Sequence, residues 1–296
     1  MNIEIRNLSK TYPNGTQALK NVTLDIPMGM FGLLGPNGAG KSSLMRTLAT
    51  LQEADAGTIQ LGDVDVLKDK DVMRGILGYL PQSFGVYPGV SAVELLDHMA
   101  ILKGISNRKE RRETVDYLLH QVNLFEARQK AVSGYSGGMR QRFGIAQALL
   151  GKPRVIIVDE PTAGLDPAER VRFLNLLSQI GEQAAIILST HIVEDVSDLC
   201  PHMAIISSGT VMLVGEPLKL MQSIKDFIWQ TTISRDQLPG FEKEYQVVST
   251  RFFMGKIVVN VYHDTLPGAS FESVLPDLKD VYFCALNGWL NPAESN

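Results

Sequence analysis

The stretch Gly35-Pro36-Asn37-Gly38-Ala39-Gly40-Lys41-Ser42 fits the pattern G-x-x-x-x-G-K-[ST], which wraps backbone around the phosphates of a nucleotide. The apolar residues 30–34 before it predict a buried strand, and residues 43–48 after it can form a helix. Glycines let consecutive N–H groups point inward, and the helix N-terminus adds partial positive charge. We therefore predict a nucleotide site in which Lys41 contacts the β- and γ-phosphates and Ser42 binds Mg²⁺.

The composition is that of an ordinary globular chain, with 296 residues, 45% hydrophobic residues and a net charge of −4. This length is enough for a core domain and a smaller additional one. The two cysteines, Cys200 and Cys284, predict no disulfide framework and fit a reducing compartment. We expect no signal peptide at the strand-like N-terminus and no membrane span, because no apolar run approaches ~18 residues. Any membrane role would then come through a partner.

The pattern along the chain predicts an α/β protein with a mostly parallel sheet. Residues 76–80, 155–158 and 185–188 are short apolar runs, typical of strands that are covered on both faces. Residues 88–151 have a mainly helical pattern and predict an inserted helical subdomain. Beyond a Gly-Glu-Pro sequence at 215–217, mixed helices and strands predict a small α+β appendix. The expected domains are therefore residues 1–215 and 216–296, and the second contains no catalytic motif.

Two adjacent acids, Asp159 and Glu160, follow the apolar strand 155–158 directly. The carboxyl ends of neighbouring parallel strands meet in one crevice, so we expect both acids near Lys41. Asp159 then suits the Mg²⁺ ion, and Glu160 is placed to orient and deprotonate an attacking water. Two acids that merely start a loop would be the structural explanation for either one alone, but the pair beside a phosphate loop favours the site.

Gln82 and His191 also follow predicted strands at this edge of the sheet. The amide of Gln82 can contact Mg²⁺ or a water, although a loop glutamine is more often only solvated. His191 would contact the γ-phosphate and sense its loss, although a lone histidine after a strand is usually structural. Both hypotheses depend on the neighbouring motifs.

Ser136-Gly137-Gly138 opens a predicted helix and forms a second N-terminus that can bind an anion. The plain interpretation is an N-cap serine followed by two glycines that ease the turn. If this N-terminus served the nucleotide at Lys41, the helices between them would have to fold back over it. A geometry in which this N-terminus binds the nucleotide of a second copy is simpler.

Two other residues have simple structural explanations. Tyr12 precedes a turn at residues 13–15, where it either covers apolar surface or stacks on a purine, and its position alone favours the first. Asp166 stands before Pro167, which predicts an N-cap and a helix through residue 180.

In this order, the motifs resemble those of the nucleotide-binding subunit of an ABC transporter over about residues 1–215. The resemblance implies a RecA-like P-loop core with an antiparallel β subdomain. It implies that Tyr12 stacks on adenine, that residues 35–42 and Ser43 bind the phosphates, and that Asp166 lies in a loop at a dimer contact. It further implies catalytic roles for Lys41, Gln82, Glu160 and His191, and Mg²⁺ ligation by Ser42, Gln82 and Asp159.

The same resemblance implies a head-to-tail dimer in which Ser136, Gly137 and Gly138 of one copy face the ATP of the other. Closure on ATP and opening after hydrolysis would move a membrane partner. The signature departs from the usual Leu-Ser-Gly-Gly-Gln at Tyr135 and at Met139, which cannot donate the hydrogen bond of a glutamine. This form, together with one ATPase unit and a short appendix, resembles the type-2 exporter branch of drug, antibiotic and polysaccharide exporters.

We therefore expect an ATPase that uses ATP and Mg²⁺, pairs with a second nucleotide-binding subunit and drives export through a separate integral membrane permease. It would lie at the cytoplasmic face of the inner membrane, with no nucleic acid as partner. The alternative is a soluble ABC-type ATPase acting on nucleic acid or ribosomes, which the absence of a basic patch disfavours. A GTPase would need Asn-Lys-x-Asp, and a non-hydrolysing subunit would not need both Glu160 and His191.

Overall fold

The structure is a computed structural model that describes residues 2–85, 87–181 and 184–290, and a central sheet organises it. Its six strands have the order β10-β9-β3-β8-β7-β6. Five of them run parallel: β3 (Met30–Leu34), β6 (Leu77–Leu80), β7 (Val155–Asp159), β8 (Ala185–Thr190) and β9 (His202–Ser207). The edge strand β10 (Thr210–Gly215) is antiparallel to β9. The predicted α/β class with a mostly parallel sheet is confirmed.

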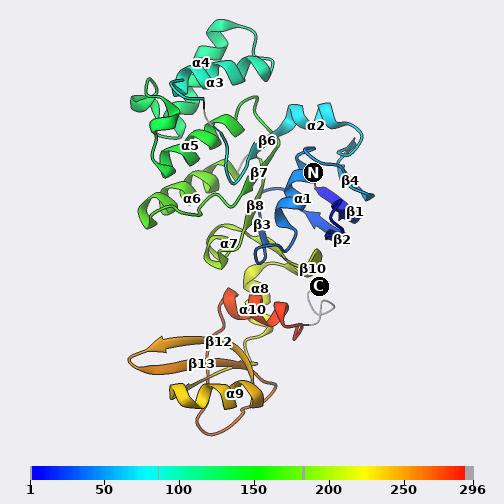
Figure 1. Ribbon diagram of the computed structural model, residues 1–296, viewed down its shortest axis with the longest axis vertical. Helices are drawn as coiled ribbons and strands as arrows, with labels where there is room; N and C mark the ends of the chain where they lie inside the picture. Colours follow the sequence, from blue (N-terminus) through cyan, green and yellow to red (C-terminus); the bar gives the residue numbers. More distant parts are fainter. Residues whose placement is uncertain (1, 86, 182–183, 291–296) are drawn as a thin grey trace.

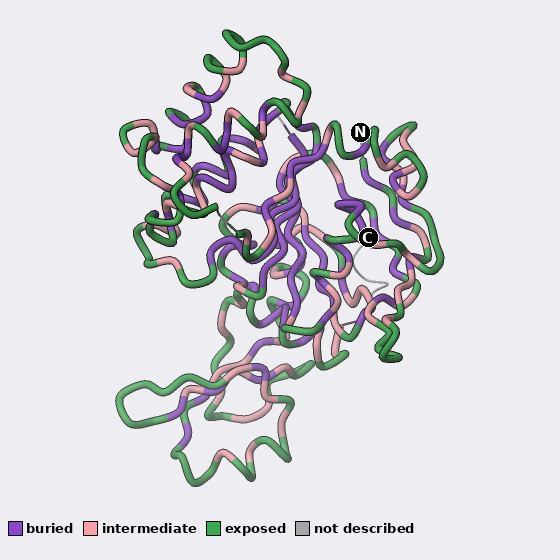
Figure 2. Tube along the Cα trace, turned by 45° about the horizontal axis from the view of Figure 1, so that its top comes forward, coloured by how far each residue is buried: buried purple, intermediate pink, exposed green. Residues whose placement is uncertain are grey.

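The central strands are apolar because both faces of the sheet are covered. Every residue of β3, β7 and β8 is buried, as Figure 2 shows in purple along the middle of the molecule. Phe31 and Leu33 of β3 pack into one hydrophobic cluster with α1 (Lys41–Leu48), whereas Leu34 packs into another with the helices on the opposite face. Alternate residues of a strand point to opposite faces, so each strand needs apolar side chains at every position.

An antiparallel sheet packs on the α1 side of the core and has the strand order β2-β1-β4-β5. Its strands are β1 (Ile3–Thr11), β2 (Gln17–Ile26), β4 (Ala56–Leu61) and β5 (Val64–Asp65). One local prediction was wrong. Ile76 was expected to begin a strand, but it ends a helix, α2 (Lys70–Ile76), so that β6 starts only at Leu77.

Helices cover the other face and extend from it. They are α3 (Ala92–Leu102), α4 (Arg108–Gln121), α5 (Gly137–Ala148), α6 (Pro167–Gly181) and α7 (Val193–Leu199), with short 3₁₀ turns at Phe125–Ala127 and Val132–Gly134. A capping box begins α3: Ser91 Oγ accepts from Glu94 N–H, and Glu94 Oε2 accepts from Ser91 N–H at 3.0 Å. In Figure 1, α3 and α4 lie at the end of the molecule opposite the C-terminal sheet.

The C-terminal residues form a third sheet, which lies between two helices in the sequence. Its strands, in the order β12-β13-β11-β14, are β11 (Ile228–Ile233), β12 (Gln246–Phe253), β13 (Lys256–Tyr262) and β14 (Glu272–Ser273). A 3₁₀ turn (Arg235–Gln237) and α9 (Leu238–Glu244) lie between β11 and β12. This sheet has its own small apolar cluster around Val259, and Figure 2 shows most of its surface as exposed or intermediate.

The two helices that flank this sheet pack against the main body. Leu220 of α8 (Pro217–Ser223) and Val281 of α10 (Leu278–Leu286) belong to the same hydrophobic cluster as Cys200. Lys279 Nζ of α10 also lies 2.5 Å from Glu194 Oε1 of α7. Within the described residues, no helix combines the length and the apolar composition that crossing a bilayer requires.

Candidate nucleotide-binding site

The predicted site residues meet at one edge of the central sheet because their strands are parallel neighbours. The phosphate loop follows β3, His191 follows β8, Glu160 follows β7 and Gln82 comes after β6, in the spatial order β3-β8-β7-β6. A cleft of ≈ 540 Å³ opens at this edge. It is lined by Tyr12, Thr16, Gln17, Ala18, Lys20, Asn37, Gly38, Ala39, Gly40, Lys41, Ser42, Ser43, Gln82, Glu160, Ser208 and Gly209.

Glycines shape the loop where the backbone has no room for a side chain. Gly40 has φ +106°, and a Cβ there would lie 2.5 Å from the carbonyl oxygen of Ala18. A Cβ at Gly35 would lie 2.2 Å from the carbonyl oxygen of Ile206. The turn between β9 and β10 supports the loop from this side, since Gly209 N–H donates to Ala39 O at 2.9 Å. Close packing therefore holds the loop in place before α1 begins.

Lys41 and Glu160 line the cleft, and His191 is connected to them through Glu160. Lys41 Nζ donates to Gly35 O at 2.7 Å and lies 3.2 Å from Glu160 Oε1. The other carboxylate oxygen, Glu160 Oε2, lies 2.6 Å from His191 Nδ1. Glu160 is 6% exposed, so this carboxylate is matched to two partners in a largely dry environment. The structure thus brings together three of the residues predicted as catalytic, with Gln82 lining the same cleft.

The backbone of Glu160 adopts an unusual conformation at this point. Its φ is +50°, in the left-handed region that non-glycine residues seldom occupy and that costs about 1–3 kcal/mol. Its N–H donates to Ser189 O of the neighbouring strand β8 at 2.8 Å. The contacts of the side chain and of this N–H hold a strained residue at the end of β7.

Asp159 is a buried carboxylate whose surroundings fit a metal ion. Burial raises the pKa of Asp159 above its usual range, and the neighbouring Ser189 and Ser42 side chains offset part of this rise. Its Oδ1 atom and Ser189 Oγ are buried without a hydrogen-bond partner among the described residues. A buried oxygen in this situation calls for a ligand, and carboxylate and hydroxyl oxygens are ligands that Mg²⁺ prefers. The donor set of Asp159 and Ser42 therefore fits Mg²⁺.

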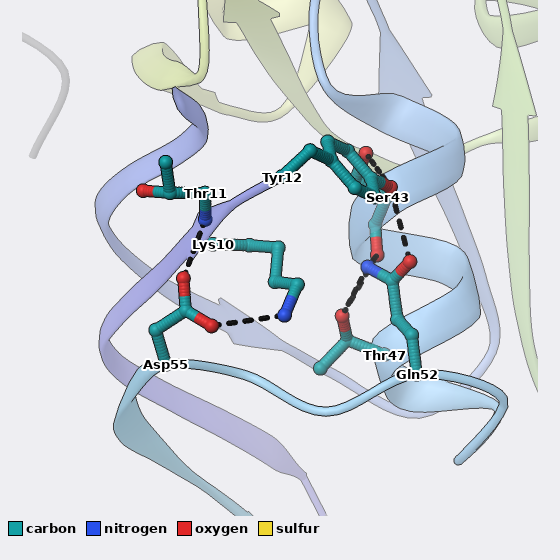
Figure 3. Close-up of polar contacts among 7 residues, drawn as sticks. All are labelled: Lys10, Thr11, Tyr12, Ser43, Thr47, Gln52 and Asp55. Atoms are coloured by element: carbon teal, nitrogen blue, oxygen red, sulfur yellow. Dashed lines mark hydrogen bonds and ion pairs between the residues drawn. The ribbon is translucent and has the colours of Figure 1, made fainter. Parts of the chain in front are cut away.

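Tyr12 lies at the border of the cleft and is fastened to α1 (Figure 3). Its hydroxyl lies 3.0 Å from both Ser43 Oγ and Gln52 Oε1. Gln52 Nε2 in turn donates to Ser43 O at 2.8 Å and to Thr47 Oγ1 at 2.9 Å. Tyr12 is thus half-buried and lines the cleft, so its role is not limited to covering apolar surface.

The signature residues lie outside the cleft. Ser136 caps α5, with Oγ accepting from Met139 N–H at 3.2 Å, and both Ser136 and Gly137 are exposed. Tyr135 is buried and donates its hydroxyl proton to Ala127 O at 2.9 Å, so it anchors the segment before the helix. Among the described residues that line the cleft, none comes from this segment.

Asp166 is the N-cap that the sequence predicts, since its Oδ1 accepts from Glu169 N–H at 2.9 Å.

Several residues near the site were not predicted. Around the start of β2, the cleft is lined by Thr16, Gln17, Ala18 and Lys20, and it is also lined by Ser208 and Gly209 from the turn between β9 and β10. The one available signal was that turn, since a glycine there permits close backbone approach.

Comparison with known proteins identifies the family. Residues 19–163 match the family described as ABC transporter. The chain is 36% identical, over 83% of its length, to an uncharacterized ABC transporter ATP-binding protein of Bacillus subtilis (strain 168), YxlF, of which it covers 81%. The chain therefore belongs to the ATP-binding proteins of ABC transporters.

Other relatives agree with this assignment. The daunorubicin/doxorubicin resistance ATP-binding protein DrrA of Streptomyces peucetius is 30% identical over 90% of this chain and 79% of its own length. The linearmycin resistance ATP-binding protein LnrL of Bacillus subtilis (strain 168) is 32% identical, with 78% and 75% covered. A dimeric ATP-binding cassette in a post-hydrolysis state, bound to ADP and Pi, superposes with a TM-score of 0.66 at 26% identity, covering 72% of this chain and 98% of that one. The chain is an ATPase of this family, and the resemblance in its motifs is confirmed.

Proposed function

We propose that this ATPase drives export through a separate membrane permease by closing on ATP as a head-to-tail pair and opening after hydrolysis. The observation that carries the proposal is the separation of two groups of residues within one chain. Lys41 and Glu160 line the cleft, with His191 against Glu160, whereas Ser136 and Gly137 are exposed at the start of α5 and outside the cleft. An exposed helix N-terminus with open backbone N–H groups suits the phosphates of a nucleotide held by a second copy.

The similar proteins support both the pairing and the direction. One similar solved structure is described as dimeric and bound to ADP and Pi, and two relatives are named for resistance to daunorubicin/doxorubicin and to linearmycin. Resistance to a toxic compound fits its removal from the cell. We therefore favour export over import, with the ATPase at the cytoplasmic face of the membrane.

The geometry gives each residue of the cleft a role in hydrolysis. The N–H groups of residues 37–42 would hold the phosphates, and Lys41 Nζ would exchange its contact with Glu160 for one with the β- and γ-phosphates. Glu160 would accept the proton of the attacking water, and His191, 2.6 Å from its carboxylate, would orient it. Mg²⁺ held by Ser42, Asp159 and Gln82 would neutralise charge on the phosphates. Tyr12 would stack on the adenine, and Asp166 would fix the loop at the dimer contact.

The test of pairing is Glu160→Gln, which keeps the shape of the side chain and removes its basicity. Turnover should fall by about 10² to 10⁴-fold, and the variant should accumulate as a dimer with saturating Mg-ATP, measured by size exclusion with light scattering. Glu126→Gln makes the same change at an exposed position and should behave as wild type. A Glu160→Gln protein that stays monomeric under these conditions would show that the sandwich is wrong.

The test of the transport role is a tagged pull-down from detergent-solubilised membranes of the native host. A stoichiometric polytopic membrane protein among the captured partners would support the permease, and its family would narrow the substrate and direction. Capture of soluble or ribosomal partners alone, by protein that still binds ATP, would overturn the transport role in favour of a soluble ABC-type ATPase.

A further inference from the structure

A second buried carboxylate, Asp195, lies behind the cleft on α7. Its Oδ2 accepts from Thr162 Oγ1 at 2.5 Å, and its Oδ1 accepts from Arg170 Nε of α6 at 2.7 Å. Asp195 is 0% exposed and Thr162 is 3% exposed. A buried carboxylate is costly unless both oxygens are matched, so this arrangement tolerates little movement.

The two partners of this contact stand close in sequence to the reacting group. Thr162 is two residues beyond Glu160, and Asp195 is four residues beyond His191. The loop after β7 and the segment after β8 are therefore joined twice. One joint is the 2.6 Å contact of Glu160 with His191, and the other is the 2.5 Å contact of Thr162 with Asp195.

The second joint matters because Glu160 is strained. With φ at +50°, the residue would relax toward the ordinary region if the loop that follows it were free. Thr162 fixes this loop to α7, while the N–H of Glu160 is fixed to β8 through Ser189 O. Together the two attachments determine where the carboxylate of Glu160 points.

We infer that Asp195 is a positioning residue for ATP hydrolysis, which holds the Glu160 loop against the His191 segment through Thr162. The inference rests on the proposed roles of Glu160 and His191. The two hydrogen bonds of the Asp195 side chain go to Thr162 and Arg170, which are not among the residues that line the nucleotide cleft, so its effect should be separate from nucleotide binding. A carboxylate displaced by about 1 Å loses about 10²-fold in rate.

The experiment measures kcat and KM for ATP in a set of matched variants of the full chain. Asp195→Asn removes the charge, and Thr162→Val removes the hydroxyl while keeping the shape of the side chain. Thr162→Ser keeps the hydroxyl, and Asp198→Asn makes the same chemical change as Asp195→Asn at an exposed position of α7. We expect kcat to fall by about 10²-fold in Asp195→Asn and Thr162→Val, with KM unchanged, and to stay near wild type in the other two.

The outcomes distinguish a failure of the role inferred for Asp195 from a failure of the role proposed for Glu160. If Glu160→Gln abolishes turnover while Asp195→Asn and Thr162→Val keep it, Asp195 positions nothing and the inference alone fails. If Glu160→Gln keeps turnover, the proposed base is wrong, and the inference falls with it. Should Asp195→Asn fail to fold, the threonine pair decides, because equal kcat values for Thr162→Val and Thr162→Ser would exclude a role for the hydroxyl.

Discussion

The helices α1 and α5 both have glycine at their N-termini, Gly40 just before α1 and Gly137 at the start of α5, and their surroundings differ. At α1, Lys41 is 5% exposed, and backbone from β2 and from the turn after β9 lies against the glycines before it. At α5, a Cβ added to Gly137 would meet nothing nearer than Leu165 Cδ2 at 4.0 Å. The first N-terminus is packed against backbone of its own chain. The second has open space beside Gly137, where the proposed nucleotide of a second copy would bind.

The largest effects should come from damaging each of these two N-termini in a separate variant and then mixing the variants. Lys41→Ala should lower turnover by about 10² to 10³-fold, because it removes the ammonium from the phosphate site. Gly137→Ala should lower turnover with folding and nucleotide binding intact, since its methyl group has room within this chain. When the two variants are mixed, turnover should recover, because one composite site then has an intact loop and an intact α5.

The control for this experiment is Gly134→Ala, another exposed glycine at which a Cβ meets nothing within 4 Å. It should leave turnover unchanged, both alone and in mixtures. Two results would contradict the composite site. One is wild-type turnover in Gly137→Ala, and the other is a mixture of Lys41→Ala and Gly137→Ala that is no more active than either variant by itself. Each chain would then hydrolyse ATP alone, and the open space beside Gly137 would bind no nucleotide.

A smaller effect is expected one residue further along α5. A Cβ at Gly138 would lie 2.3 Å from Glu169 Oε2, and Glu169 is held by ion pairs with Arg142 and Arg172. Gly138→Ala should therefore lower the free energy of unfolding by about 1–3 kcal/mol, measured by denaturant titration. Gly137→Ala should leave the free energy of unfolding unchanged. Equal unfolding curves for the two alanine variants would contradict the expectation that a methyl group fits at Gly137 and clashes at Gly138.

The smallest effect concerns Asp159 in the closed site. Its raised pKa means that the folded protein binds the proton more tightly than the unfolded chain does, so stability falls as pH rises through that pKa. Asp159→Asn should then raise the melting temperature at pH 7 without Mg²⁺ by about 1–3 °C. The gain should shrink as the pH falls below the raised pKa, where wild-type Asp159 is also protonated, and a lower melting temperature of Asp159→Asn at pH 7 would refute this account.

Local patterns predicted the parts of the fold that local chemistry determines. The strand at residues 155–158 is apolar throughout because both faces are buried, and Ser91 with Glu94 encodes its own cap. The phosphate-loop motif predicted the strand before it and the helix after it, because its glycines form the tight turn that joins these two elements around a phosphate. Parallel strands then implied that Glu160 and His191 would share an edge with Lys41, and the structure brings them together.

Other features depend on contacts that no local pattern reveals. The helix α9 contains Pro239 and Gly240, and it forms where Leu238 and Phe241 pack on the C-terminal sheet. Gly209 reaches the phosphate loop only because β9 is the neighbour of β3. Asp195 stands in a polar sequence that suggests a solvated helix, and its burial comes from α6 and the loop after β7.

The packing of α8 and α10 also limits where the chain can be divided into separately folding parts. Both helices belong to the hydrophobic cluster of the ATPase, so a breakpoint at residue 216 would expose apolar surface on each product. The sheet within residues 228–273 has an apolar cluster of its own, although Ile228 and Val248 also belong to the cluster of the ATPase. Its chain leaves and returns between two helices that touch each other. A change of length within this sheet can therefore leave in place the two helices that seal the ATPase.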